Sequence, residues 1–134
     1  YLNTMWRWSI AMQNDFAARA DWCVKSYAEA NHQPVVVLAH SADIKAKPGS
    51  KVSLSAAGTS DPDGDSLTFN WWQYAEAGTY PGSVDISDSD SVNAMLTVPA
   101  DAKSGQTIHV VCEVTDNGTP RLTRYARVIV NVVK

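Results

Sequence analysis

The sequence has 134 residues, of which 45% are hydrophobic and 19% are charged. This length suits one ordinary domain or a smaller domain with an appendage, and the apolar content is sufficient for a core. The formal net charge of −3 argues against a nucleic-acid-binding surface and against binding to anionic membranes. No apolar run approaches the roughly 20 residues that cross a bilayer.

Residues 1–33 differ from the rest in their hydrophobic pattern, which has helical spacing and predicts one amphipathic helix. Asn14 or Asp15 is a suitable N-cap and Pro34 bars continuation, so we expect a helix of about 15 to 18 residues between them. The apolar residues upstream of Asn14 should pack against another part of the protein. There is no signal segment and no initiator Met, so we expect a piece of a longer protein. Residues at helical spacing are Phe16, Ala20, Cys23, Val24, Tyr27 and Ala28.

From residue 34 to residue 134 the pattern is that of short strands and turns. About seven strands with turn signals between them predict an immunoglobulin/PKD/cadherin-like β-sandwich. Residues 41–50 read as a polar connection. The expected strands are residues 35–38, 51–55, 67–74, 83–86, 94–98, 107–115 and 122–133.

Two adjacent tryptophans stand in the strand at 67–74. Side chains alternate between the faces of a strand, so Trp71 shares a face with Leu67 and Phe69 and is the predicted core anchor. Trp72 and Tyr74 point the other way. Trp72 is either buried by the loop that follows or available for binding.

An aromatic surface is the first candidate site. It consists of Trp72, Tyr74, Glu76 and Tyr80. Exposed aromatic faces beside polar groups can stack on sugar rings, and they serve equally well to dock another domain.

An acidic turn is the second candidate site. Asp61, Asp63 and Asp65 alternate along the turn, and Asp116 follows a later strand that can end beside it. Oxygen ligands in such an array suit Ca²⁺. The EF-hand pattern is absent, because Ser66 and Trp72 stand where that loop needs Gly and Glu. A turn whose carboxylates cap their own backbone is the favoured reading, and a calcium site is the alternative.

Catalytic machinery is not predicted. The three histidines are scattered over a helix end, a linker and a strand, and nothing makes a nucleophile–His–acid set. Asp15 on its own reads as an acid stabilised by the N-terminus of its helix.

An ordered series of motifs resembles the C-terminal domain of bacterial secreted proteins described as cellulose-binding. Those proteins pair an N-terminal nucleoside-hydrolase-like domain with an immunoglobulin-like one. The stretch at 13–23 resembles the last helix of the hydrolase-like domain. The motifs are Gln-Asn-Asp-Phe-Ala-Ala-Arg at 13–19, Asp-Trp-Cys at 21–23, Asp-Pro-Asp-Gly-Asp at 61–65, Trp-Trp-Gln-Tyr at 71–74, Glu-Ala-Gly-Thr-Tyr at 76–80, Val-Thr-Asp-Asn-Gly-Thr-Pro at 114–120 and Arg-Tyr-Ala-Arg-Val at 124–128.

The resemblance implies a secreted or periplasmic protein with a carbohydrate-related role. It implies that residues 1–33 end a preceding hydrolase-like domain and that residues 34–134 form the sandwich. By motif position Asp15 would match a calcium-binding aspartate of the longer protein, with Asn14 where a catalytic histidine would stand. That departure implies no catalysis by this chain.

Two functions follow as expectations. The leading one is a non-catalytic accessory module that binds a cellulose-like polysaccharide or a glycoside through the aromatic surface. The alternative is a structural domain that docks on the hydrolase-like domain and shapes its pocket.

Overall fold

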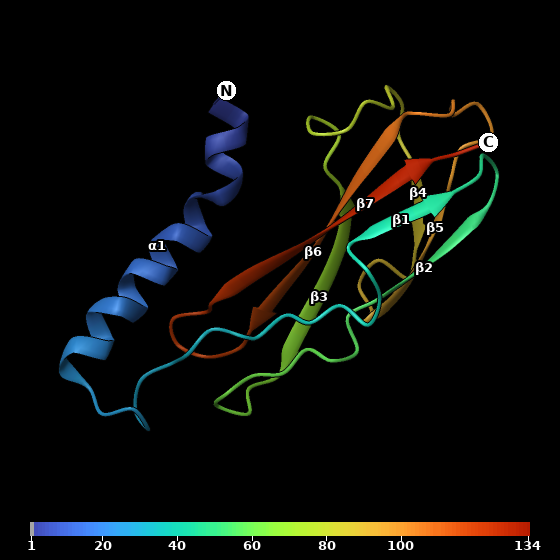
Figure 1. The fold of residues 1–134 in the computed structure, drawn as a ribbon. Helices are drawn as coiled ribbons and strands as arrows, with labels where there is room; N and C mark the ends of the chain where they lie inside the picture. The colour runs from blue at the N-terminus through green and yellow to red at the C-terminus, as the bar shows by residue number, and fades with distance from the viewer. Residues whose placement is uncertain (1) are drawn as a thin grey trace.

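The structure, a computed structural model, describes residues 2–134, with side chains described from Trp6 onward. Within these residues one long helix precedes seven strands (Figure 1). No helix among the described residues is both long and apolar enough to cross a membrane. The elements are α1 (Leu2–Val24), β1 (Asp43–Ala46), β2 (Lys51–Ser55), β3 (Leu67–Gln73), β4 (Asp85–Ser87), β5 (Asn93–Thr97), β6 (Thr107–Asp116) and β7 (Thr123–Val132).

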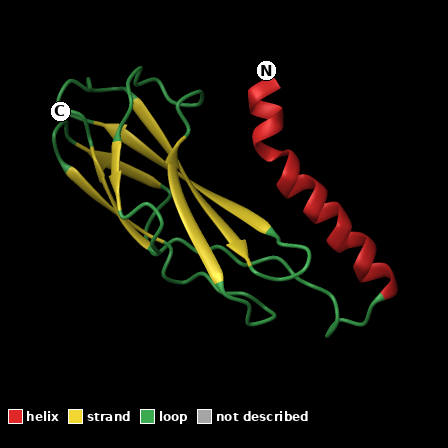
Figure 2. Ribbon diagram, turned by 180° about the vertical axis from the view of Figure 1, so that it is seen from behind, coloured by secondary structure: helices red, strands yellow, loops and turns green. Residues whose placement is uncertain are grey.

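The strands form two sheets packed into a sandwich, as predicted. The larger sheet has the order β1-β7-β6-β3 and the smaller one has the order β2-β5-β4. β1 runs parallel to β7, and the other neighbouring pairs are antiparallel. Helix α1 lies outside the sandwich, along the outer face of the larger sheet (Figures 1 and 2).

Strict alternation in the strands builds the core. Every second residue of β6 from Ile108 onward is buried, and so are Val128, Val130 and Val132 in the second half of β7. The predicted role of Trp71 is confirmed: it is 2% exposed, and its Nε1 donates a hydrogen bond to Ser91 O at 2.9 Å. Leu67 and Phe69 share its face and pack against the same core.

Two strand predictions were wrong at one edge of the sandwich. The segment 41–50, expected as a polar connection, contains β1, because Ile44 and Ala46 alternate inward beside β7. The run 35–38 forms only an isolated bridge between Val35 and Ser60. Val36 and Leu38 still pack against the core, so burial rather than sheet pairing explains their apolar character.

The helix prediction was wrong at both ends. Asn14 and Asp15 lie in the middle of α1, and the helix ends at Val24 rather than near Pro34. Residues 2–24 contain no Gly or Pro, so nothing interrupts the helix upstream. The predicted apolar face was also wrong: Phe16 and Val24 are exposed, and the less exposed side of α1 carries Trp8, Ala11 and Ala18 instead.

Candidate functional site

The aromatic surface lies on the outer face of the larger sheet, beneath α1. Trp72 stands on β3, Tyr74 follows the end of that strand, and Tyr125 stands on β7. The ring centroids of Trp72 and Tyr74 are 5.7 Å apart. Both side chains are partly exposed, in contrast with the buried Trp71 beside them.

Trp8 of α1 packs onto this surface. Its ring meets Tyr125 edge-on at a centroid distance of 4.8 Å and lies 5.8 Å from Trp72 and 6.1 Å from Tyr74. We call Trp8, Trp72, Tyr74 and Tyr125 the aromatic cluster. Tilted and edge-on pairs at these separations contribute about 0.5–1.5 kcal/mol each beyond their buried area. The cluster therefore joins the helix to the sheet.

Arg7 adds a paired charge to the rim of the cluster. Its guanidinium carbon lies 5.1 Å from the Trp72 ring centroid and 5.5 Å from that of Tyr74. Its two terminal nitrogens donate to the two carboxylate oxygens of Glu76 at 3.0 and 3.2 Å. This hydrogen bond lowers the pKa of Glu76 and raises the pKa of Arg7.

A second ion pair joins α1 to β7. Arg124 donates to Asp15 Oδ1 at 2.8 Å, and Arg19 donates to Asp15 Oδ2 at 3.1 Å. Burial by itself raises the pKa of the Asp15 carboxyl, but the two arginines outweigh it and leave that pKa below its ordinary value. Both carboxylate oxygens are thus engaged within this chain, and calcium binding by Asp15 stays a prediction for the longer protein.

Burial controls the titration of Tyr125. Burial, followed by the nearby charge of Glu113, raises its pKa to about 12. The phenol is therefore neutral at physiological pH. It serves as an aromatic wall for Trp8 rather than as an acid or a base.

Tyr80 does not belong to the aromatic surface, which corrects the expected set of four residues. It is 7% exposed and lies in the core, and its hydroxyl donates to Asp101 Oδ1 at 2.8 Å. Gly82 lies against the ring, where an added Cβ would come within 2.8 Å of the hydroxyl oxygen. The loop after Tyr74 turns this aromatic inward, and no periodicity in a loop could have indicated that.

The acidic turn has the capped geometry that its residues favour. Asp61 Oδ1 accepts hydrogen bonds from the backbone N–H of Asp63 at 2.8 Å and of Asp65 at 3.2 Å. Gly64 adopts a positive φ of 74°, which a residue with a side chain rarely adopts. The turn is thus held by its own backbone.

Three of the four predicted acids nevertheless converge. Each of Asp61, Asp65 and Asp116 offers a carboxylate oxygen within 4.8 Å of the others. Asp116 is 2% exposed and accepts from the N–H groups of Gly118 and Leu122 at 3.1 and 2.9 Å. The expectation that Asp116 lies beside the turn is confirmed. We call these three residues the acidic triad.

The charge balance of the acidic triad fits a hard cation. Asp61 Oδ2 is buried and has no hydrogen-bond partner among the described residues. Burial, followed by the charges of Asp61, Asp116 and Asp63, raises the pKa of Asp65. A Ca²⁺ ion held by the acidic triad would supply the missing partner and neutralise the repulsion.

Asp63 is directed away from the triad and towards the segment after α1. Its carboxylate accepts from His32 N at 2.6 Å and lies 3.0 Å from His32 Nδ1. The His32 ring stacks on the rings of Trp22 and Tyr27, with centroid distances of 5.7 and 4.0 Å.

The residue before His32 contacts the acidic triad itself. Asn31 Nδ2 donates to Asp116 Oδ2 at 3.0 Å and to Pro120 O at 2.7 Å. The linker after α1 is therefore attached to the same end of the sandwich as the acidic triad.

Comparison with solved structures gives a similar structure over nearly the whole chain. It is described as a nucleoside hydrolase-related hypothetical protein from Saccharophagus degradans that is associated with carbohydrate metabolism. The match has 47% identity and a TM-score of 0.90, and it covers 94% of this chain but 32% of that one. This chain thus spans about a third of the length of that protein.

A more distant match is the PKD domain from the KIAA 1837 protein. It has 16% identity and a TM-score of 0.49, and it covers 78% of this chain and 91% of that one. No curated protein sequence matches. The family model described as "Cellulose-binding protein Sde0182, C-terminal domain" matches residues 51–132, well over half of the chain. The chain therefore belongs to this family of C-terminal domains of cellulose-binding proteins.

Proposed function

We propose that this chain is a non-catalytic accessory module of a carbohydrate-associated protein, and that its sandwich holds a preceding nucleoside-hydrolase-like domain through α1. The observation that carries the proposal is the position of Trp8, which packs between Trp72, Tyr74 and Tyr125. The face that would have to be open for a sugar is occupied by an aromatic of the chain itself. Two ion pairs from α1, at Arg7 and at Asp15, fix the helix in register.

The opposite face of α1 supports the same proposal. It carries no charged side chain over four turns, and its large apolar side chains are open to solvent. These are Trp6 (68% exposed), Ile10 (71%), Phe16 (75%) and Val24 (83%). A helix that is apolar on two faces is normally buried on both. We assign the outer face to the preceding domain because the similar hydrolase-related protein is about three times as long as this chain.

Polysaccharide binding is the second candidate function, and an extracytoplasmic location belongs to it. The family description favours it, and Trp72 and Tyr74 keep part of their surface exposed. Stacking on a sugar would then require either their remaining exposed edges or release of Trp8.

One pair of variants distinguishes the two functions. If the aromatic cluster is a docking contact, Trp8→Ala lowers the melting temperature and increases acrylamide quenching of the remaining tryptophans, whereas Ile10→Ala on the outer face changes neither. If the cluster binds sugar, the wild type is retained on insoluble cellulose and Trp72→Ala is not. Retention of the wild type on insoluble cellulose, together with an unchanged melting temperature for Trp8→Ala, would overturn the docking proposal.

A further inference from the structure

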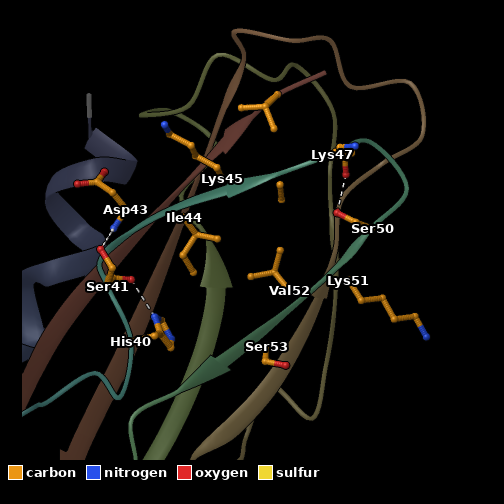
Figure 3. A pocket seen from close by; sticks show the side chains of 12 residues that line it. His40, Ser41, Asp43, Ile44, Lys45, Lys47, Ser50, Lys51, Val52 and Ser53 are labelled. Carbon is orange, nitrogen blue, oxygen red and sulfur yellow. Dashed lines mark hydrogen bonds between the residues drawn. The ribbon is translucent and has the colours of Figure 1, made fainter.

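A groove runs along one side of the sandwich, between the edges of its two sheets (Figure 3). β1 is the last strand of the larger sheet and β2 is the last strand of the smaller one, and residues from both line the groove. The groove lies apart from the aromatic cluster and from the acidic triad, and neither docking nor sugar stacking uses it.

The backbone of β2 faces this groove with hydrogen-bonding groups that have no partner among the described residues. Val98 N–H donates to Ser50 O at 2.8 Å and Ala56 N–H donates to Val92 O at 3.0 Å, so the even-numbered residues of β2 bond to β5. In an antiparallel ladder the residues between them direct their N–H and C=O groups the other way. Lys51 and Ser53 therefore present a donor and an acceptor each to the open edge.

The open stretch of β2 has a defined end. At Ser55 the edge is covered, because Ala39 N–H donates to Ser55 O at 3.0 Å and Ser55 N–H donates to His40 Nε2 at 3.0 Å. β1 mirrors this arrangement across the groove. Ala42 O accepts from Ile129 N–H of β7 at 2.7 Å, and Ala46 O accepts at 2.9 Å from Val133 N–H, directly after β7, which leaves the backbone of Lys45 directed outward.

The side chains of the groove combine an apolar floor with a basic rim. Figure 3 shows Ile44 and Val52 between the two strands, with Lys45 and Lys51 extending from opposite sides. Lys45, Lys47 and Lys51 line the groove, and no ion pair of these lysines occurs in the part of the chain that the structure describes. Asp43 is the only acidic residue of the lining, in a chain whose net charge is −3.

We propose that the groove binds an extended acidic segment of polypeptide, which adds to the open edge of β2 as a further strand. Lys51 and Ser53 supply the backbone hydrogen bonds, and alternate apolar side chains of the segment lie on Ile44 and Val52. Its acidic side chains face Lys45, Lys47 and Lys51. An extended backbone satisfies the open ladder groups of β2, which is why a polypeptide fits this groove better than a polymer that is only charged.

The test uses a fluorescent peptide of about six residues, the length of a typical strand, that alternates glutamate and valine. Anisotropy measures its binding to the 134-residue protein, and amide NMR locates it. We expect saturable binding that weakens with salt and shifts the amide signals of Lys51 and Ser53. A peptide with proline at its centre should bind much more weakly, because proline removes a ladder donor.

Charge reversal gives the matched comparison. The double variant Lys45→Glu/Lys51→Glu should lower the affinity by about tenfold, since several exposed ion pairs are lost and like charges replace them. Lys25→Glu, directly after the C-terminal end of α1 and outside the groove, should leave the affinity unchanged, and circular dichroism checks that the variants fold. Equal binding of the proline peptide, or of the double variant, would overturn the proposal.

Two other outcomes also overturn it. Binding of carboxymethylcellulose without binding of the peptide would assign the groove to an anionic polysaccharide. Binding of neither probe would leave the lysines as protection of two short edge strands against aggregation. Because the aromatic cluster is untouched in the double variant, these results do not depend on the proposed function.

Discussion

The aromatic cluster and the acidic triad are both built from parts of the chain that are far apart in sequence, but they differ in how their charges are balanced. Around the aromatic cluster, Arg7 meets Glu76 and Arg124 meets Asp15. In the acidic triad three carboxylates converge, and among the described residues none of them forms an ion pair and one oxygen of Asp61 has no hydrogen-bond partner. The carboxylates around the aromatic cluster are balanced by arginines of the chain, whereas no ion pair among the described residues balances the acidic triad.

That difference predicts that an added cation or proton affects the acidic triad, whereas truncation of a side chain affects the aromatic cluster. The aromatic cluster should weaken most when one of its own side chains is truncated. The acidic triad should be strengthened from outside, by a cation or by a proton. Asn31 and His32, in the linker after α1, contact Asp116 and Asp63. Stabilisation of the acidic triad would therefore extend to the C-terminal end of α1.

The largest expected effect is that of calcium on the acidic triad. Free Ca²⁺ at about 100 times its Kd should raise the free energy of unfolding by about 2.7 kcal/mol, because it binds only the folded chain. Calorimetric titration and the melting temperature measure the effect. Asp65→Asn should abolish it, since Asp65 offers one of the three convergent oxygens and no hydrogen bond of its carboxylate is found in the described part of the chain.

Asp90→Asn is the control for the calcium experiment. Asp90 is exposed and lies outside the acidic triad, and its substitution by Asn removes the same charge as Asp65→Asn. It should leave the calcium response intact. Titration without heat and without a shift in melting temperature would leave residues 61–65 as a turn capped by its own backbone.

The next effect in size concerns the aromatic cluster. Trp8→Ala removes a partly buried aromatic and should lower the free energy of unfolding by about 2 kcal/mol. Trp72→Ala should lower it by a similar amount. In the double variant the two losses should fall short of additivity by about 1 kcal/mol, because the ring pair is lost only once. Denaturant unfolding of the four proteins measures this coupling.

A coupling near zero would contradict the assigned contact between Trp8 and Trp72. Trp6→Ala provides the matched control, because Trp6 is 68% exposed on the same helix. Its effect should stay within about 0.5 kcal/mol, as for other surface substitutions.

These two regions also differ in how far the sequence predicts them. The burial of Trp71 and the approach of Asp116 to the acidic turn follow from strand alternation and from hairpin topology, which are local rules. The partner of Trp72 does not follow from any such rule. Trp8 lies 64 residues earlier, upstream of the predicted helix start at Asn14 or Asp15, and only tertiary packing determines which helical face meets the sheet.

Short and irregular segments account for the remaining differences. β1 has four residues, two of them charged, and it forms because β7 offers a free edge. Tyr80 turns into the core from a loop, where no periodicity exists to indicate it. Asn31 and His32 are ordinary polar residues in sequence, and their contacts with Asp116 and Asp63 depend on the path of the linker.

A smaller effect, with opposite signs in the two regions, is expected from pH. The pKa of Asp15 is lowered, so its ion pair stabilises the fold above the ordinary range of an aspartate and is lost as the pH falls through the folded-state pKa. The pKa of Asp65 is raised, so without calcium its repulsion is relieved as the pH falls through its folded-state pKa. At neutral pH, Asp15→Asn should destabilise the fold and Asp65→Asn should stabilise it.

Urea unfolding at several pH values measures both differences. Each variant should converge on the wild type at acid pH, where the wild-type carboxyl is also neutral. A stabilising effect of Asp65→Asn that persisted unchanged to acid pH would point to a gain other than relief of charge repulsion.

The smallest expected effect is that of the exposed ion pair at the rim of the aromatic cluster. Glu76→Gln removes the carboxylate that faces Arg7, and the loss of stability should be slight because half of the Glu76 side chain is open to solvent. The loss should shrink further in concentrated salt, whereas the effect of Trp8→Ala should not, because apolar contacts are not screened. If Glu76→Gln proved as damaging as Trp8→Ala, the bidentate contact with Arg7 rather than the stacked rings would be what holds α1 against the sheet.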